Sequence, residues 1–233
     1  MLILFDIDGT LLLSQRAGTL SMHAAARELY GDQFTFDGIE IGGWLDPLIW
    51  DAVARANGIE DPASQHDRFR ATYLRHFEER LARNSTVAAL PGVVELIEAL
   101  SRESEICLGL LTGNYPETGR MKIEAAGLDL DSFPVAVWGD DGGHRRELAV
   151  VAMEQYASHT GQTIEPHDVL IIGDTIHDID CAKANGCRCL AVATGVGSAD
   201  ELGALEPDLL VDDLSDTSSI LAWMLKPVET VSD

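Results

Sequence analysis

Two acidic residues separated by one position, Asp6 and Asp8, follow the apolar run at positions 2–5 and precede Gly9. Four consecutive apolar residues ahead of a glycine turn predict a buried strand of a parallel sheet. Alternate residues of a strand point to the same side, so both carboxylates are expected together at the carboxyl end of this strand, where open α/β sheets bind ligands. One carboxylate could attack a substrate while the other moves protons.

Two later segments show the same pattern of an apolar run followed by small polar or acidic residues. Thr112, Gly113 and Asn114 follow one run, and Asp174 and Asp178 follow another. An Asp-x-Asp-Gly sequence alone is more often a turn than a site. Three such strand ends, in this order along one chain, indicate a site that the sheet assembles from distant segments.

On these three segments the chain resembles the haloacid dehalogenase-like superfamily, and within it the phosphoglycolate phosphatase-like branch with a helical cap of the first class. The family's motif I, Asp-x-Asp-Gly-Thr, matches positions 6–10, its motif II matches Thr112, and its motif IV, Gly-Asp-x-x-x-Asp, matches positions 173–178. The resemblance spans positions 2 to about 211. It implies an α/β fold: a Rossmann-like three-layer α/β/α core with a parallel sheet, plus an inserted all-helical cap domain.

The order of predicted elements agrees with such a core. Beyond position 106, strand-like runs alternate with helix-like ones, which is typical of a parallel sheet with helices on its faces. Strands are expected near 106–111, 135–138, 169–172 and 189–193, with a last edge strand at 209–211. Helices are expected between them, one ending at Gly127 and others at about 145–159 and 178–184.

The segment from 14 to about 88 has no obvious buried strand and much helical periodicity. Helices are expected at 19–30, 46–57 and 63–83, and the resemblance implies a cap of four helices. Asp46 followed by Pro47 is typical of an N-cap with proline at the first helical position. The domains are therefore predicted as a catalytic core, residues 1–13 and 89–233, and a cap, residues 14–88. Asp46 and Trp44 are candidates for specificity, with helix capping and core packing as the alternatives.

The chemistry of phosphate esters explains why such acids would need a cation. A phosphate dianion repels a carboxylate, so a divalent cation and fixed hydrogen-bond donors are required before a nucleophile can react. Mg²⁺ prefers oxygen ligands, and Asp6 and Asp174 are its expected side-chain ligands. The resemblance adds that Asp6 is the nucleophile, forming an aspartyl-phosphate, and that the backbone carbonyl of Asp8 is a further metal ligand.

Asp8 and Asp178 are given supporting roles in the same mechanism. Asp8 is expected to protonate the leaving oxygen and then to accept a proton from the attacking water. Asp178 lies four residues after Asp174 and is expected to hold a metal-bound water or to orient Asp174. The alternative for Asp178 is an ordinary acid at a helix N-terminus.

Phosphate binding is assigned to a second strand end and to one basic residue. The hydroxyl of Thr112 and the N–H groups of Gly113 and Asn114 would hold the phosphoryl oxygens. Many relatives carry a motif III lysine, but this chain has no lysine between positions 122 and 183. Arg145 is the expected substitute, with Arg146 and Lys122 as alternatives.

Composition excludes some partners and leaves others open. The 39 acidic residues against 16 basic ones give a net charge of −23, which disfavours nucleic acid or an anionic membrane as a partner. Apolar stretches fall short of the ~18 residues of a membrane span, so a cytoplasmic protein is expected. The partner would be a small phosphate ester, and the oligomeric state stays open.

Three functions remain in view on these grounds. The first is a Mg²⁺-dependent phosphatase that hydrolyses a small phosphorylated metabolite through an aspartyl-phosphate. The second is a sugar-phosphate mutase of the same fold, which would use the same residues but keep water away from the intermediate. The third is a catalytically silent regulatory binding protein. Such a protein should have lost some of the predicted acids, but Asp6, Asp8, Asp174 and Asp178 are all present.

Overall fold

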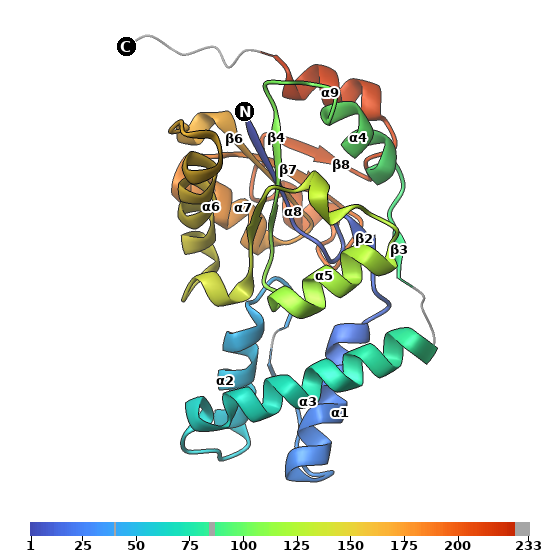
Figure 1. The fold of residues 1–233 in the computed structure, drawn as a ribbon, viewed down its shortest axis with the longest axis vertical. Coiled ribbons are helices and arrows are strands. Elements are labelled where there is room, and N and C mark those ends of the chain that lie inside the picture. Colours follow the sequence, from blue (N-terminus) through green and yellow to red (C-terminus); the bar gives the residue numbers. More distant parts are fainter. Residues whose placement is uncertain (40, 84–86, 227–233) are drawn as a thin grey trace.

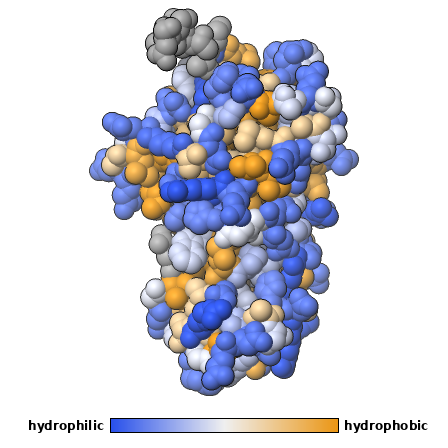
Figure 2. Space-filling view, turned by 90° about the vertical axis from the view of Figure 1, so that its left-hand side faces the viewer, coloured by the Kyte–Doolittle hydropathy of each residue, from blue (hydrophilic) through white to orange (hydrophobic). Residues whose placement is uncertain are grey.

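The computed structural model describes residues 1–39, 41–83 and 87–226. Figure 1 shows two bodies, an upper one that contains a sheet and a lower one made of helices. Most residues on the face in Figure 2 are hydrophilic, on both bodies, with smaller apolar patches between them. No helix within the described ranges is long and apolar enough to cross a membrane.

A six-stranded parallel sheet forms the centre of the upper body, the core. Its strands lie in the order β5 (Val135–Val137), β4 (Cys107–Leu111), β1 (Leu2–Phe5), β6 (Val169–Gly173), β7 (Arg188–Val192) and β8 (Leu209–Val211). All four residues of β1 are fully buried, which explains its uninterrupted apolar sequence. β1 pairs with β4 on one side and with β6 on the other, so the three strands that carry the predicted motifs are neighbours.

Helices cover both faces of this sheet. Ile3 and Phe5 point to the face covered by α4 (Val93–Leu100), α5 (Pro116–Ala125) and α9 (Thr217–Met224). Leu2 and Leu4 point to the opposite face, covered by α6 (Arg145–Thr160), α7 (Ile176–Asn185) and α8 (Ala199–Gly203). Short 3-10 helices occur at Leu130–Ser132, Gly139–Asp141 and Pro166–Asp168. The three-layer α/β/α core with a parallel sheet is confirmed.

The lower body, the cap, consists of helices with their own apolar core. Its helices in the described part of 14–88 are α1 (Ala17–Tyr30), α2 (Asp46–Ala56) and α3 (Pro62–Arg83). In the centre, Trp50 stacks on Phe69 with ring centroids 4.1 Å apart. The cap therefore shows three helices rather than the expected four. Between α1 and α2 the chain carries several glycines, which favour an irregular segment over a further helix.

Two short paired strands lie where the chain passes between core and cap. β2 (Leu12–Leu13) pairs antiparallel with β3 (Ala88–Ala89). This ribbon lies beside the boundaries predicted at 13/14 and 88/89, which stay a prediction. At the start of α2, Leu45 is the N-cap and Asp46 is already the first helical residue, so the capping role predicted for Asp46 is wrong by one position.

Candidate active site

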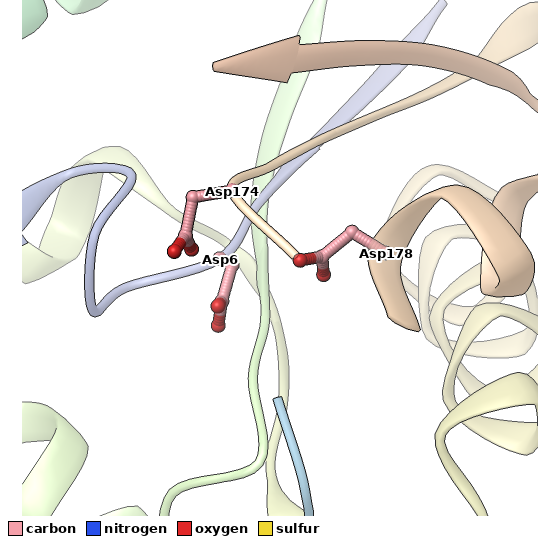
Figure 3. A group of neighbouring side chains, drawn as sticks. All are labelled: Asp6, Asp174 and Asp178. Atoms are coloured by element: carbon pink, nitrogen blue, oxygen red, sulfur yellow. The ribbon is translucent and has the colours of Figure 1, made fainter. Parts of the chain in front are cut away.

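Three carboxylates meet at the carboxyl edge of the sheet. Asp6 follows β1, Asp174 follows β6, and Asp178 lies in the first turn of α7 (Figure 3). They are 5%, 2% and 0% exposed, and one carboxylate oxygen from each lies within 4.8 Å of the others. The pairing of β1 with β6, which sets Phe5 opposite Ile172, brings the first two acids together.

This cluster carries more negative charge than its one basic partner can balance. The Nη2 of Arg145 lies 2.5 Å from Oδ1 of Asp178 and 3.3 Å from Oδ2 of Asp6. Burial raises the pKa of both Asp6 and Asp174, and neighbouring carboxylates raise both further. Three buried oxygen-donor groups that share one guanidinium fit a hard divalent cation, which would relieve this repulsion.

Asp178 is oriented by two partners and does not line the cavity described below. Its Oδ2 accepts hydrogen bonds from Oγ1 (2.6 Å) and N–H (3.0 Å) of Thr175, and Oδ1 faces Arg145. Thr175 is the N-cap of α7, as its position before a helical segment predicts. Asp178 therefore has both oxygens engaged, which suits a residue that positions its neighbours.

A loop after β7 fixes the carboxylate of Asp174. The N–H of Val196 donates to its Oδ2 at 3.1 Å, and Thr10 Oγ1 donates to Oδ1 at 3.3 Å. A Cβ added at Gly195 would lie 1.6 Å from Oδ2, so only glycine fits there. Sequence reasoning missed this loop, although small and polar residues directly after an apolar strand were the signal used for the other three strand ends.

Asp8 belongs to a separate hydrogen-bond network. Its Oδ1 accepts from Ser14 Oγ at 2.8 Å, and its Oδ2 accepts from Lys122 Nζ at 2.5 Å and from Asn114 Nδ2 at 2.9 Å. Burial acts to raise the pKa of Asp8, but the charge of Lys122 and the three donors outweigh it, so the pKa lies below its usual value. The sequence did not indicate Ser14 at all.

The three basic candidates for the missing motif III lysine have different surroundings. Arg145 is buried beside Asp6 and Asp178, whereas Arg146 is exposed and pairs with Asp180 at 2.6 Å. Lys122 is 3% exposed and pairs with Asp8, and its Nζ also donates to Asn114 Oδ1 at 2.6 Å. Of the three, only Arg145 has an ion pair with Asp6, whereas Lys122 has its ion pair with Asp8.

The end of β4 forms one side of the site. Thr112 is 1% exposed, and its Oγ1 accepts from Asn114 Nδ2 at 2.8 Å and from Asn114 N–H at 3.4 Å. The carbonyl of Gly113 accepts from the N–H of Asp46 at 2.7 Å. A Cβ at Gly113 would lie 2.0 Å from the carbonyl oxygen of Trp44, so the close approach of the cap requires glycine.

One cavity of about 670 Å³ collects these groups between core and cap. The predicted residues that line it are Asp6, Asp8, Thr112, Gly113, Asn114, Arg145 and Asp174, together with Lys122 and Ser14. Ligand sites usually lie in cavities of roughly 300–1,000 Å³. The specificity candidates Trp44 and Asp46 also line it.

Asp46 connects the cap to the core. It is 7% exposed, and its Oδ2 accepts from the N–H of Tyr115, the N-cap of α5, at 2.9 Å. Burial raises the pKa of Asp46 to about 7. Its side chain is therefore engaged by the backbone of the core.

Comparison with known families gives one extensive match. The family model described as haloacid dehalogenase-like hydrolase matches residues 3–192. The chain is similar to pyrophosphatase PpaX of Oceanobacillus iheyensis, 26% identical over 94% of this chain and 95% of that protein. It is also similar to phosphoglycolate phosphatase of Chromobacterium violaceum, 25% identical over 94% of this chain and 95% of that protein.

Solved structures share the same fold. CbbY from Rhodobacter sphaeroides, solved as a mutant in complex with xylulose-(1,5)bisphosphate, has a TM-score of 0.74 at 20% identity and covers 92% of this chain and 95% of its own. A hydrolase from Pseudomonas syringae has a TM-score of 0.72 at 23% identity and covers 96% of this chain and 99% of its own. These similarities extend over both bodies of the molecule.

Proposed function

The chain belongs to the haloacid dehalogenase-like hydrolases, and we propose that it is a Mg²⁺-dependent phosphatase that hydrolyses a small phosphorylated metabolite through an aspartyl-phosphate at Asp6. One observation carries the proposal. Buried Asp6 lies in a cluster of three carboxylates, and Asp8, held by three hydrogen-bond donors, lines the same cavity. Relatives that are named phosphatase and pyrophosphatase support phosphate chemistry.

The residues that would hold the cation are Asp6, Asp174 and the backbone carbonyl of Asp8, with Asp178 positioned behind them. The fit rests on Asp6, Asp174 and Asp178, whose buried carboxylates each offer an oxygen within 4.8 Å of the others. A Mg²⁺ ion bound there would neutralise the charge that otherwise keeps a phosphate dianion away from Asp6.

The protein groups divide the remaining steps between them. A carboxylate oxygen of Asp6 would attack phosphorus while the bond to the leaving oxygen breaks and Asp8 supplies the proton for that oxygen. The negative charge of the bound phosphate would raise the lowered pKa of Asp8 for this step. Asp8 would then accept a proton from the water that hydrolyses the acyl phosphate and frees Asp6. Thr112, Gly113 and Asn114 would hold phosphoryl oxygens, and Arg145 would keep Asp6 in place and balance charge.

The two alternatives receive less support. The relatives named above are phosphatases, which favours transfer to water over transfer to a second sugar hydroxyl. A silent binding protein would not need the Asp8 network, which is complete in this structure. A cytoplasmic location remains an expectation.

The test is a set of phosphorylated metabolites incubated with Mg²⁺, with free phosphate and rearranged product both measured. We expect phosphate release, loss of activity in EDTA, and a loss of about a thousandfold or more in Asp6→Asn, because the amide keeps the shape but cannot attack phosphorus. Asp180→Asn, which alters an exposed acid, is the matched control.

Three results would reject this function. They are Asp6→Asn activity within about tenfold of the native enzyme, full activity in chelator, or a rearranged product without free phosphate. Circular dichroism of Asp6→Asn establishes that the fold is retained, so that loss of activity reports on chemistry.

A further inference from the structure

The cavity has two unlike sides. The core side carries the charged and polar groups described above. The cap side also carries polar residues, but it includes five apolar side chains, which we call the apolar wall: Met22, Ile39, Ile41, Trp44 and Ile49. In Figure 1 the segment between α1 and α2 extends from the cap to the sheet, in keeping with the hydrogen bond from the N–H of Asp46 to Gly113.

The apolar wall is continuous with the core of the cap. Met22 and Ile49 are each 2% exposed and belong to the same buried cluster as Trp50. Ile39, Ile41 and Trp44 are half-buried and pack against that cluster while lining the cavity. Their remaining surface faces the place where the substituent of a phosphate ester would lie.

Two exposed apolar side chains from the core line the same cavity. Val196 is 76% exposed and Leu13 is 43% exposed. Val196 belongs to the loop that fixes Asp174, and a Cβ at Gly42 would lie 3.2 Å from its Cγ2. Apolar surface that gathers around a ligand cavity gains free energy when an apolar ligand group covers it.

The charged groups of the cavity leave a single base, among the described residues, that could pair with a second anion. Its lining contains the four acids Asp6, Asp8, Asp46 and Asp174 against the three bases Arg16, Lys122 and Arg145. Lys122 and Arg145 are engaged by carboxylates. The remaining base, Arg16, is exposed at the start of α1 and has no ion pair with another described residue.

We infer that the substrate's leaving group is apolar, so that this phosphatase acts on phosphate monoesters of aliphatic or aromatic alcohols rather than on carboxylated or doubly phosphorylated metabolites. The inference rests on the proposed function and adds its substrate class. A cavity of about 670 Å³ exceeds what a phosphoryl group needs, and the apolar wall lines part of the remaining space. A second anion placed there would lose its hydration against apolar surface without gaining a paired charge from the wall.

Two matched series of substrates test the inference. One consists of ethyl, butyl and hexyl phosphate, and the other of the carboxylated esters of the same lengths, beginning with phosphoglycolate. We expect kcat/KM of the alkyl series to rise about three- to fourfold per added CH₂ until the wall is covered. At equal length the carboxylate should lower kcat/KM at least tenfold. A flat alkyl series, or a preference for the carboxylated esters, would overturn the inference.

Two substitutions of matched kind locate the effect. Ile41→Asn places a polar group in the apolar wall and should remove most of the gain from ethyl to hexyl phosphate. Ile59→Asn is the control, because Ile59 also packs half-buried on the cap cluster but does not line the cavity. The inference is wrong if both variants lose the chain-length dependence equally while remaining folded.

Arg16→Gln tests the competing role of the unpaired arginine. We expect the ratio of alkyl to carboxylated activity to change less than twofold. If Arg16 binds a second anion of the substrate, the variant should instead lose activity selectively on the carboxylated esters by tenfold or more, and the inference fails.

Binding of non-hydrolysable phosphonates separates the substrate class from the reaction. Calorimetry should show that hexylphosphonate binds more tightly than ethylphosphonate and phosphonoacetate. If neither ester series is hydrolysed but this order of binding holds, binding of apolar groups at the apolar wall is supported and the phosphatase proposal fails. If all esters are hydrolysed at equal rates and the phosphonates bind equally, the phosphatase proposal is supported and the inference of an apolar leaving group is rejected.

Discussion

The two sides of the cavity are built on different physical principles. On the core side, the functional groups lie on strand ends and helices and are paired with an opposite charge or a donor: Arg145 lies between Asp6 and Asp178, and Lys122 faces Asp8. On the cap side, apolar side chains from helices and a glycine-containing segment form the surface. If the proposed function holds, the difference teaches that the sheet fixes the geometry of the reaction while packing in the cap recognises the substrate.

A few polar contacts join the two sides. Arg145 Nη1 donates to the carbonyl of Gly43 at 3.1 Å, so the same guanidinium that balances the acids also holds the cap segment. Farther out, Arg70 of α3 pairs with Glu117 at 2.7 Å and with Asp140 at 2.8 Å. The contrast between a charged core side and an apolar cap side can therefore be tested at the residues that connect or balance them.

Among the residues that connect or balance the two sides, the largest effect is expected at Arg145. Arg145→Ala should cost about 3 kcal/mol of transition-state stabilisation, about a hundredfold in kcat/KM, because Asp6 and Asp178 lose the basic side chain that pairs with both of them. Arg145→Lys should recover much of it, since the positive charge is kept. Kinetics with the best phosphate ester measure both, and thermal unfolding separates loss of stability from loss of catalysis.

Arg146→Ala serves as the control for this prediction, because Arg146 is exposed and pairs only with Asp180 among the described residues. It should change kcat/KM less than twofold. If Lys122→Ala costs more than Arg145→Ala, the assignment of the motif III charge to Arg145 is wrong and moves to Lys122.

A smaller effect, about tenfold in kcat, is expected for Lys122→Met. The hydrogen bond from Lys122 to Asp8 indicates that it acts by positioning Asp8. The loss should therefore nearly disappear in an Asp8→Asn background, as a double-mutant cycle can measure. Losses that multiply independently in the double variant would show that Lys122 acts on the substrate directly.

The smallest effect concerns the contact of Asp46 with the core. Burial raises the pKa of Asp46 from 3.8 to about 7, so its ionisation is disfavoured in the folded protein. A raised folded-state pKa means that stability is lost as pH rises from about 4 through about 7. Asp46→Asn keeps an oxygen acceptor for the Tyr115 N–H and cannot ionise, so the variant should not lose this stability as the pH rises.

The melting temperature of Asp46→Asn should therefore exceed that of the native protein at pH 8 by a few degrees, ~4 °C for each kcal/mol regained, and the gain should shrink towards pH 4. Asp51→Asn is the control, since it changes an exposed acid of the same helix that pairs with Arg55. An unchanged or lower melting temperature at pH 8 would show that Asp46 is stabilising as the carboxylate.

The local parts of the site could be predicted from short stretches of sequence. Apolar runs followed by small polar or acidic residues identified the ends of β1, β4 and β6, because strand burial and turn formation depend on a few consecutive residues. The same reasoning located the end of a helix at Gly127, which lies just after α5 in the left-handed conformation, with φ of 74°. It erred by one residue at Asp46, where the helix starts directly after Leu45.

The sequence by itself determined which strand ends carry acids, and the tertiary structure decided which groups meet them. Lys122 and Asp8 are 114 positions apart, and Arg145 and Asp178 are 33 apart. Such contacts depend on how helices pack on the sheet, which no short window of sequence encodes. The apolar wall likewise exists only because three segments of the cap fold against one another, and burial of their shared apolar surface is a property of the whole packed assembly.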